Sequence, residues 1–286
     1  RRQPAPAPAK APGGLIPPDL YSTFLDTPVE PLAWVSLAYV GAAEIADGTD
    51  DLATGEVAAR LNLARWRNLL AGDLDLDLRL RTEFFGGDGG FDIMPTALVA
   101  LPLDLRWSWR FLDGTSFQLG ARPGIYADAE ALGGGMFGLP FHLAWYRVVT
   151  PRFSWMAGLE VRPAWDLPVM PLLGVAWEPS DFWRFELAVP MSRAQFQVGP
   201  VMLFGTFAWR NTTYAMSGDD GDPDELTAED LLLSGGVQVR ASDTFNLAAE
   251  VGMLMNRTLT AEGTAGEGEL DLDGAPFLRL TFGGSF

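Results

Sequence analysis

The feature that most constrains this chain is a strict two-residue alternation of apolar and charged side chains. Successive side chains of a β-strand point to opposite faces, so such an alternation predicts a strand with one apolar and one charged face. The clearest example lies between residues 73 and 81, where Leu74, Leu76, Leu78 and Leu80 alternate with Asp73, Asp75, Asp77, Arg79 and Arg81.

The same alternation recurs along the chain, in segments 103–110, 137–146, 153–162, 183–189 and 245–253. No uncharged apolar run approaches the roughly 18 residues that a membrane helix needs. The longest candidate, Val198 to Trp209, contains two glycines and a proline. We therefore predict an all-β protein and exclude a helical membrane protein.

Two architectures bury such strands: a soluble sandwich turns the apolar faces inward, whereas a membrane barrel turns them towards lipid. The connections favour the barrel because short and long ones alternate, as tight periplasmic turns and larger external loops do. The short connections are expected at 66–68, 112–115, 149–152, 178–181 and 241–244. The long ones are expected at 46–53, 86–95, 128–135, 217–229 and 261–274.

Tryptophan placement favours the same architecture. With that orientation most tryptophans fall near the periplasmic strand ends, where a bilayer interface attracts the indole ring. Trp34 and Trp66 have uncertain or lumen-side parity. The predicted membrane girdle therefore consists of Trp107, Trp109, Trp145, Trp155, Trp177 and Trp183.

We predict a transmembrane, antiparallel, up-and-down β-barrel formed by residues 33–286. The expected strands lie at 33–46, 54–66, 70–84, 96–110, 115–128, 136–148, 152–164, 169–177, 181–190, 193–199, 201–216, 230–241, 244–260 and 274–286. This gives about 14 strands, with 12 possible because the division between Met191 and Val201 is weak. Bulges or local unpairing are expected at Pro102, Pro123, Pro140, Pro163 and Pro171, since proline lacks the ladder donor.

Residues 1–32 differ from the rest. The stretch from Arg1 to Pro18 is rich in proline and alanine, which predicts an extended periplasmic segment. No cleavable leader is visible, and we interpret Arg1 as the start of a mature chain. Tyr21, Phe24 and Leu25 follow, so 1–32 is also a candidate for binding a protein partner.

The last strand carries a resemblance. Leu278, Leu280 and Phe282 alternate with other residues, and the chain stops on Phe286. This resembles the C-terminal signature of bacterial outer-membrane β-barrel proteins, and the chain looks most like small, porin-like barrels of that class. The resemblance implies recognition by the barrel-assembly machinery. It also implies a place in the bacterial outer membrane, among its lipid and lipopolysaccharide.

Charged residues on the inward faces are the candidate pore lining. Strand parity selects Asp73, Asp75, Asp77, Arg79, Arg81, Asp104, Arg106, Arg122, His142, Glu160, Arg162, Arg184, Glu186, Arg240, Glu250 and Arg279. Both signs occur in similar numbers. Two interpretations stay open: a water-filled pore with a transverse field, or cross-strand ion pairs that satisfy one another and partly fill the lumen.

The external loops are acidic. Asp220, Asp222 and Asp224 form a weak calcium candidate, because hard oxygen donors suit that ion. Glu225 stands where a calcium loop needs glycine, so solvated loops are the preferred interpretation and no cofactor is expected. The formal charge of -17 argues against nucleic-acid binding, which needs a basic surface.

An enzyme is not predicted. His142 is the single histidine, and Ala144 stands where the outer-membrane phospholipases would place a serine. We interpret His142 as a hydrogen-bonded lumen residue. Cysteine is absent, which removes thiol chemistry and disulfides.

The leading functional hypothesis is a passive channel for small hydrophilic solutes. The alternative is a non-conducting structural component that anchors an outer-membrane assembly. A soluble β-sandwich binding module is a third hypothesis, which solubility without detergent would reveal.

Overall fold

The computed structural model describes residues 33–45, 51–86, 95–130, 137–163, 165–216, 224–242, 244–263 and 266–284. Within those ranges no helix is long and apolar enough to cross a membrane.

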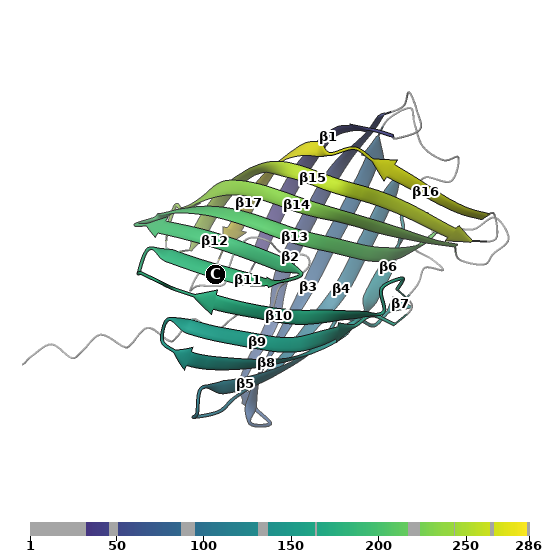
Figure 1. Cartoon of the computed structure of the whole chain (residues 1–286). Coiled ribbons are helices and arrows are strands. Elements are labelled where there is room, and N and C mark those ends of the chain that lie inside the picture. Colours follow the sequence, from purple (N-terminus) through teal and green to yellow (C-terminus); the bar gives the residue numbers. More distant parts are fainter. Residues whose placement is uncertain are drawn as a thin grey trace, which may run out of the picture.

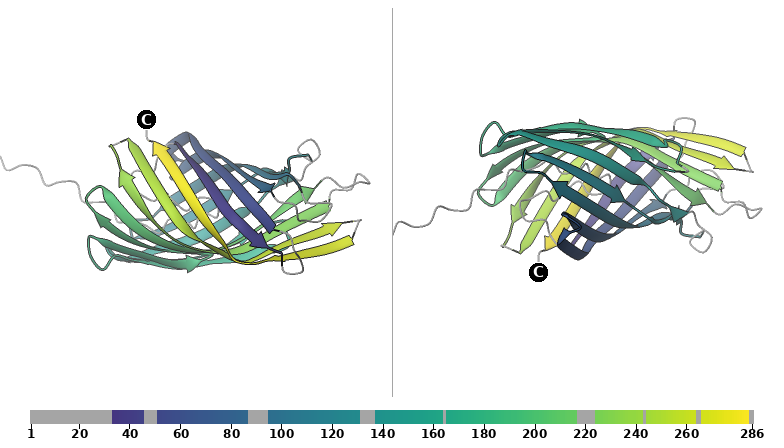
Figure 2. Two further views of the ribbon diagram at one scale, coloured as in Figure 1. Left: turned by 90° about the horizontal axis from the view of Figure 1, so that it is seen from above. Right: turned by 90° about the horizontal axis from the view of Figure 1, so that it is seen from below.

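One sheet of 17 strands makes up the fold (Figure 1). Strands that lie side by side in the ring pair antiparallel, and β17 pairs with β1 from Ala33↔Gly284 to Val40↔Phe277, which closes the ring. Figure 2 shows the yellow last strand beside the purple first strand. The strands are β1 (Ala33–Glu44), β2 (Asp51–Leu69), β3 (Gly72–Gly86), β4 (Ala97–Arg110), β5 (Thr115–Ala121), β6 (Gly124–Asp128), β7 (Phe137–Gly138), β8 (Phe141–Thr150), β9 (Phe153–Val161), β10 (Val169–Trp177), β11 (Trp183–Val189), β12 (Met191–Val198), β13 (Val201–Met216), β14 (Asp224–Arg240), β15 (Phe245–Gly263), β16 (Gly266–Leu272) and β17 (Ala275–Gly284).

A crossing is one passage of the chain from one end of the barrel to the other. Three crossings are each made by two consecutive strands, so the 17 strands form 14 crossings. β5 and β6 are separated at Pro123, β7 and β8 at Pro140, and β16 and β17 at 273–274. The prediction of 14 strands is confirmed and the count of 12 is wrong. Proline explains two breaks, because it cannot donate to the ladder. Pro102 and Pro171 nevertheless stay inside β4 and β10.

We call the barrel end with residues 33 and 284 and the short turns the turn end, and the opposite end the loop end. Between the ends, large apolar side chains point outward. Val251 is 60% exposed, Leu203 51% and Leu278 49%. Their strand neighbours, such as Glu250 and Arg279, point inward and are buried. An apolar exterior around a polar interior is the arrangement of a transmembrane barrel.

Aromatic rings follow the exterior of the turn end from β4 to β11. The contacts are Trp107–Trp109 (ring centroids 4.7 Å apart), Phe117–Trp145 (6.2 Å), Trp145–Trp155 (5.0 Å), Trp177–Phe185 (5.8 Å) and Trp183–Phe185 (5.5 Å). Such a belt is typical of a membrane surface. All six predicted girdle tryptophans lie in it.

Trp66 points outward and Trp34 points inward. A register shift between Asn62 and Ala64 turns Trp66 outward, where it pairs with Leu74 and is 45% exposed. Trp34 faces the interior and packs with Phe204. Strand parity alone did not assign Trp66 because one bulge exchanges the two faces.

At the loop end of β14 to β16 the polarity of the two faces reverses. Outward positions change from Leu233 and Met253 to Glu229, Thr260 and Glu262. The inward side chains there are leucines and alanine, buried together: Leu226, Leu259, Ala261, Leu270 and Leu272. A polar exterior over a dry core is what water, rather than lipid, selects.

The reversal corrects two predicted loops. Residues 224–229 belong to β14 and 266–272 form β16, although both were expected to be loop. Their acidic outward residues suggested loops, but their inward leucines continue the strand alternation. These strand ends therefore project beyond the apolar belt.

The belt and the projecting ends are expected to respond differently to an outward charge. Val251→Arg, in the middle of the belt, should lower the free energy of unfolding by about 2–4 kcal/mol, since the guanidinium would face hydrocarbon. Thr260→Arg, outward on the same strand but beyond the belt, should cost less than about 1 kcal/mol. Urea titration of the barrel folded into phospholipid vesicles measures both, and equal costs would contradict the assigned membrane boundary.

Candidate functional site

The first cluster of interior charges lies on β2, β3 and β4 and is centred on Asp77. Its Oδ2 accepts from Arg60 Nη2 at 2.9 Å and Arg106 Nη2 at 2.8 Å, and its Oδ1 accepts from Asn62 Nδ2 at 2.8 Å. Asp77 is fully buried. One carboxylate thus accepts hydrogen bonds from two guanidinium groups, one on each of its two neighbouring strands.

A second ion pair continues this cluster. Like charges stand directly opposite each other, Arg60 across from Arg79 and Asp77 across from Asp104. Direct like-charge pairs repel. The side chains instead pair diagonally, and Arg79 Nη2 lies 2.7 Å from Asp104 Oδ2.

The second cluster lies around Glu160 of β9. Its Oε2 accepts from Arg122 Nη2 at 2.8 Å, and its Oε1 from Arg162 Nε at 2.7 Å. His142 stands across from Glu160 on β8. Its ring lies over Gly120, where a Cβ atom would come within 2.1 Å of the imidazole.

The predicted hydrogen bond of His142 to another side chain is not found among the described residues, so hydrogen bonding of this lumen residue stays a prediction. Neither of its ring nitrogens has a hydrogen-bond partner there, although the residue is buried. With no hydroxyl or thiol nucleophile bonded to it, His142 lacks the contact that a nucleophile–base pair requires.

The third cluster joins strands on both sides of the closure between β17 and β1. The Glu56 carboxylate lies 3.1 Å from Arg81 Nη2, 3.4 Å from Arg210 Nη1 and 3.2 Å from Arg279 Nη2. Arg279 also contacts Glu250 at 3.3 Å. The cluster therefore ties β2, β3, β13 and β17 together across the interior.

Several interior charges were missed by parity. They are Glu56, Arg60, Arg193, Arg210 and Arg257. Arg257 would face outward by strict alternation, but Asn256 adopts a left-handed φ of 48° and the resulting bulge turns Arg257 inward. A simple rule would have found them: an arginine in a membrane strand faces the interior whatever its local parity.

The remaining predicted lining residues lie near the turn end. Asp73 pairs with Arg67 at 3.0 Å, and Asp75 pairs with Arg65. Arg184 donates from Nε to Glu186 at 2.7 Å. Arg240 is the last residue of β14 and is partly exposed. That any of these residues lines a water-filled pore stays a prediction.

Apolar layers cover the central charges at both ends. Towards the turn end, Trp34, Ala58, Met202, Phe204 and Ala248 pack across the interior. Towards the loop end lies the larger core of Leu226, Leu259 and Leu270. Among the interior charges, Asp77, Glu160, Arg162 and Glu250 are at most 1% exposed. These charges are buried and paired, as in the second of the two interpretations.

The predicted calcium and assembly sites lie partly outside the described residues. Asp220 and Asp222 lie outside them, and Asp224 begins β14. Among the described residues no group of three acidic or histidine side chains could hold a metal. Leu278, Leu280 and Phe282 point outward and are 39–49% exposed, whereas Phe286 is not described. Calcium binding and recognition by an assembly machinery stay predictions.

A closed antiparallel ring with an apolar exterior, an aromatic belt and an ionised interior leaves one architecture. The chain has the fold of an outer-membrane β-barrel.

Comparison with known proteins adds no closer assignment. No family model and no curated protein matches the chain. Among solved structures, a deltaS2 mutant of the TodX monoaromatic hydrocarbon channel is 8% identical, with a TM-score of 0.46 and 89% of each chain covered. The beta domain of the Bordetella autotransporter BrkA is 14% identical (TM-score 0.31, covering 89% of this barrel and 98% of that chain). A mutant Rh. blastica porin is 9% identical (TM-score 0.27, covering 87% and 99%). Likenesses this low carry no argument about what the barrel does.

Removing the carboxylate at the centre of the first cluster should destabilise the folded barrel. Asp77→Asn leaves Arg60 and Arg106 buried without their counter-ion, and it should lower the free energy of unfolding by about 3–5 kcal/mol. Asp75→Asn is the matched control on the same face of β3. It breaks a more exposed pair, so its cost should be about 1 kcal/mol or less. Urea titration in vesicles measures both, and a small cost for Asp77→Asn would contradict the network.

The projecting loop end predicts a dependence on pH. Burial of the Glu225 carboxyl, with the nearby Glu262 and Asp166 carboxylates, raises the pKa of Glu225. A raised folded-state pKa favours the protonated form. Its contribution to stability is therefore full below the ordinary carboxyl pKa and is lost as the pH rises through the folded-state pKa.

Glu225→Gln should therefore stabilise the barrel at pH 7, where the native carboxylate is charged. The gain should vanish near pH 4, where both side chains are neutral. Unfolding measured at the two pH values checks this, with Glu269→Gln on the same outward face as the control. An equal gain at both pH values would refute the electrostatic cause.

Proposed function

We propose that this barrel lies in the bacterial outer membrane and is a channel for small hydrophilic solutes that is closed at rest. In this orientation the turn end faces the periplasm and the loop end faces the exterior. The observation that carries the proposal is the fully buried, ion-paired layer of charges at mid-height. An open diffusion pore would expose the Asp77 and Glu160 carboxylates to water, and both are buried.

The charged layer supports a channel over a permanent plug. A buried ion pair is often less stabilising than well-packed apolar residues of the same volume. The loop end already holds such an apolar core. A charged layer is favourable when the interior must accept water in a second state, because paired groups can then exchange partners for water.

Buried polar atoms without a hydrogen-bond partner also support a channel for hydrophilic solutes. Arg257 Nη1, Gln195 Nε2 and Thr206 Oγ1 are buried without a hydrogen-bond partner in the described part of the barrel. Buried polar groups normally have hydrogen-bond partners. Their presence on the interior faces supports hydrophilic rather than apolar solutes.

The alternative is a non-conducting barrel that anchors an outer-membrane assembly. The apolar layers on both sides of the charges favour it, since together they resemble the core of a soluble domain. In that case residues 1–32 are the proposed binding segment for a partner. Contacts with lipopolysaccharide and with the barrel-assembly machinery are proposals under either function.

Electrical recording in planar bilayers tests the proposal. The purified barrel should insert and remain closed most of the time, with brief openings that pass ions of both signs, because the interior carries both. A steady, wide conductance would contradict the closed state. Complete silence, together with a partner that co-purifies and is lost on deleting residues 1–32, would favour the anchoring role.

A further inference from the structure

The loop-end half of β13 leaves its neighbour and meets the opposite wall. β12 pairs with β13 from Val198↔Val201 to Met191↔Ala208, and β13 then continues to Met216. Near its end Ala215 pairs in parallel with Ala127 of β6, on the other side of the ring. Residues 211–216 are all buried. Two opposite walls of the barrel are thus in contact at this level.

The connection between β9 and β10, of which residues 162–163 and 165–168 are described, contacts both walls. Arg162 is fully buried and donates from Nη1 to the backbone oxygen of Asn211 on β13, at 3.1 Å. Its Nε binds Glu160, so one guanidinium group links the wall at β9 to the wall at β13.

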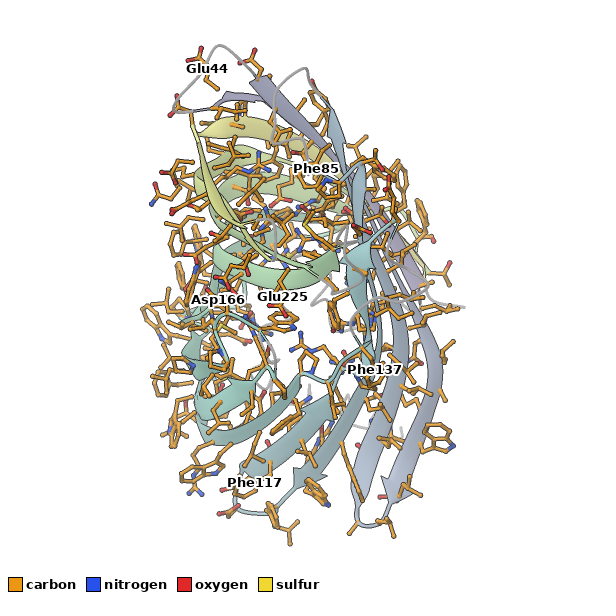
Figure 3. All side chains as sticks on the ribbon, turned by 90° about the vertical axis from the view of Figure 1, so that its right-hand side faces the viewer. Glu44, Phe85, Phe117, Phe137, Asp166 and Glu225 are labelled. Carbon is orange, nitrogen blue, oxygen red and sulfur yellow. The ribbon has the colours of Figure 1, made fainter. Side chains whose placement is uncertain are left out.

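Two further contacts strengthen the link. The Arg162 guanidinium lies 4.9 Å from the ring centre of Trp165, whose ring packs edge-on against Tyr126 of β6 at 5.4 Å. The Asp166 backbone N–H donates to Thr213 Oγ1 on β13 at 3.3 Å. Figure 3, which looks onto the loop end, places Asp166 beside Glu225, between the two groups of strands.

We propose that these side chains form a latch that holds β6 and β13 together and so keeps the proposed channel closed. The latch consists of Arg162, Trp165, Asp166, Tyr126, Asn211 and Thr213. The inference rests on the proposed function, because a barrel that never conducts has nothing to gate. Its release separates the two walls and joins the interior into one lumen of 14 crossings.

The two walls are held together by far fewer backbone pairs than the neighbouring strands within each wall, which suits a contact that opens. Neighbouring strands are held by long ladders, such as the 16 register pairs from Val201 to Met216 between β13 and β14. β6 and β13 share a single register pair among the described residues. β6 itself is five residues long and is separated from β5 at Pro123. The contact between β6 and β13 can therefore separate while the ladder between β6 and β4 stays intact.

A reversible cross-link tests the latch directly. The chain has no cysteine, so Ala127→Cys combined with Ala215→Cys introduces one unique pair. Paired residues of adjacent strands lie within the Cα separation of about 4.4–6.8 Å that a disulfide spans. We expect efficient cross-linking under mild oxidation, loss of channel openings while the bond is intact, and their return on reduction. The two single-cysteine variants, treated with the same oxidant, are the controls.

Weakening the latch should have the opposite effect. Trp165→Ala removes the ring between Arg162 and Tyr126 and should raise the fraction of time spent open by at least about tenfold, corresponding to about 1.4 kcal/mol. Trp177→Ala is the matched control, since it removes an outward girdle ring and touches no latch residue. Should Trp165→Ala fail to fold, the cysteine pair alone decides the question.

The outcomes separate the latch from the proposed function. Openings that persist unchanged in the oxidised cysteine pair, or a pair that does not cross-link, overturn the latch and leave the channel standing. Silence of the wild type, of Trp165→Ala and of the reduced cysteine pair overturns the channel itself, and the latch with it.

Discussion

The whole structure depends on one constraint: an ionised side chain in a membrane strand has a single tolerable direction. Hydrocarbon offers a guanidinium group no partner, so every charge within the belt must turn to the interior. From residue 33 onward every cation of this chain is an arginine, which stays charged at any relevant pH. Where strict alternation would point an arginine at lipid, a bulge in the backbone turns the side chain inward. The bulge at Asn256 brings Arg257 inward at the cost of one unpaired residue.

Gathering the charges creates a second demand, because buried charges must be compensated. The register places like charges opposite one another on β2, β3 and β4, and the side chains therefore pair diagonally with opposite charges. Each carboxylate at a cluster centre contacts two or three guanidinium groups, so the loss of one such carboxylate leaves several buried charges without their partner. In the proposed channel, opening therefore requires a movement of whole strands, and the contact between β6 and β13 is held by a single register pair among the described residues.

Much of the architecture was predictable. The two-residue period gave the strand class, the order of crossings and the outward set of Leu278, Leu280 and Phe282. Alternating connection lengths gave 14 crossings. Two differences from the prediction, at Trp66 and Arg257, have one cause: parity is a local rule that a single inserted residue reverses. The loops predicted at the ends of β14 and β16 have another cause, because the outward faces of these strands are acidic and stand in water.

By itself, the sequence determined a closed barrel with a lipid-facing exterior, because the strand period and the exclusion of charge from hydrocarbon act on neighbouring residues. The tertiary structure alone decided that the interior is filled: which charges pair, which apolar layers cover them, and that Arg162 reaches Asn211 across the lumen. Those contacts join residues far apart in the chain. Their existence depends on how sharply the wall bends at its bulges and prolines, and no periodicity records the bend.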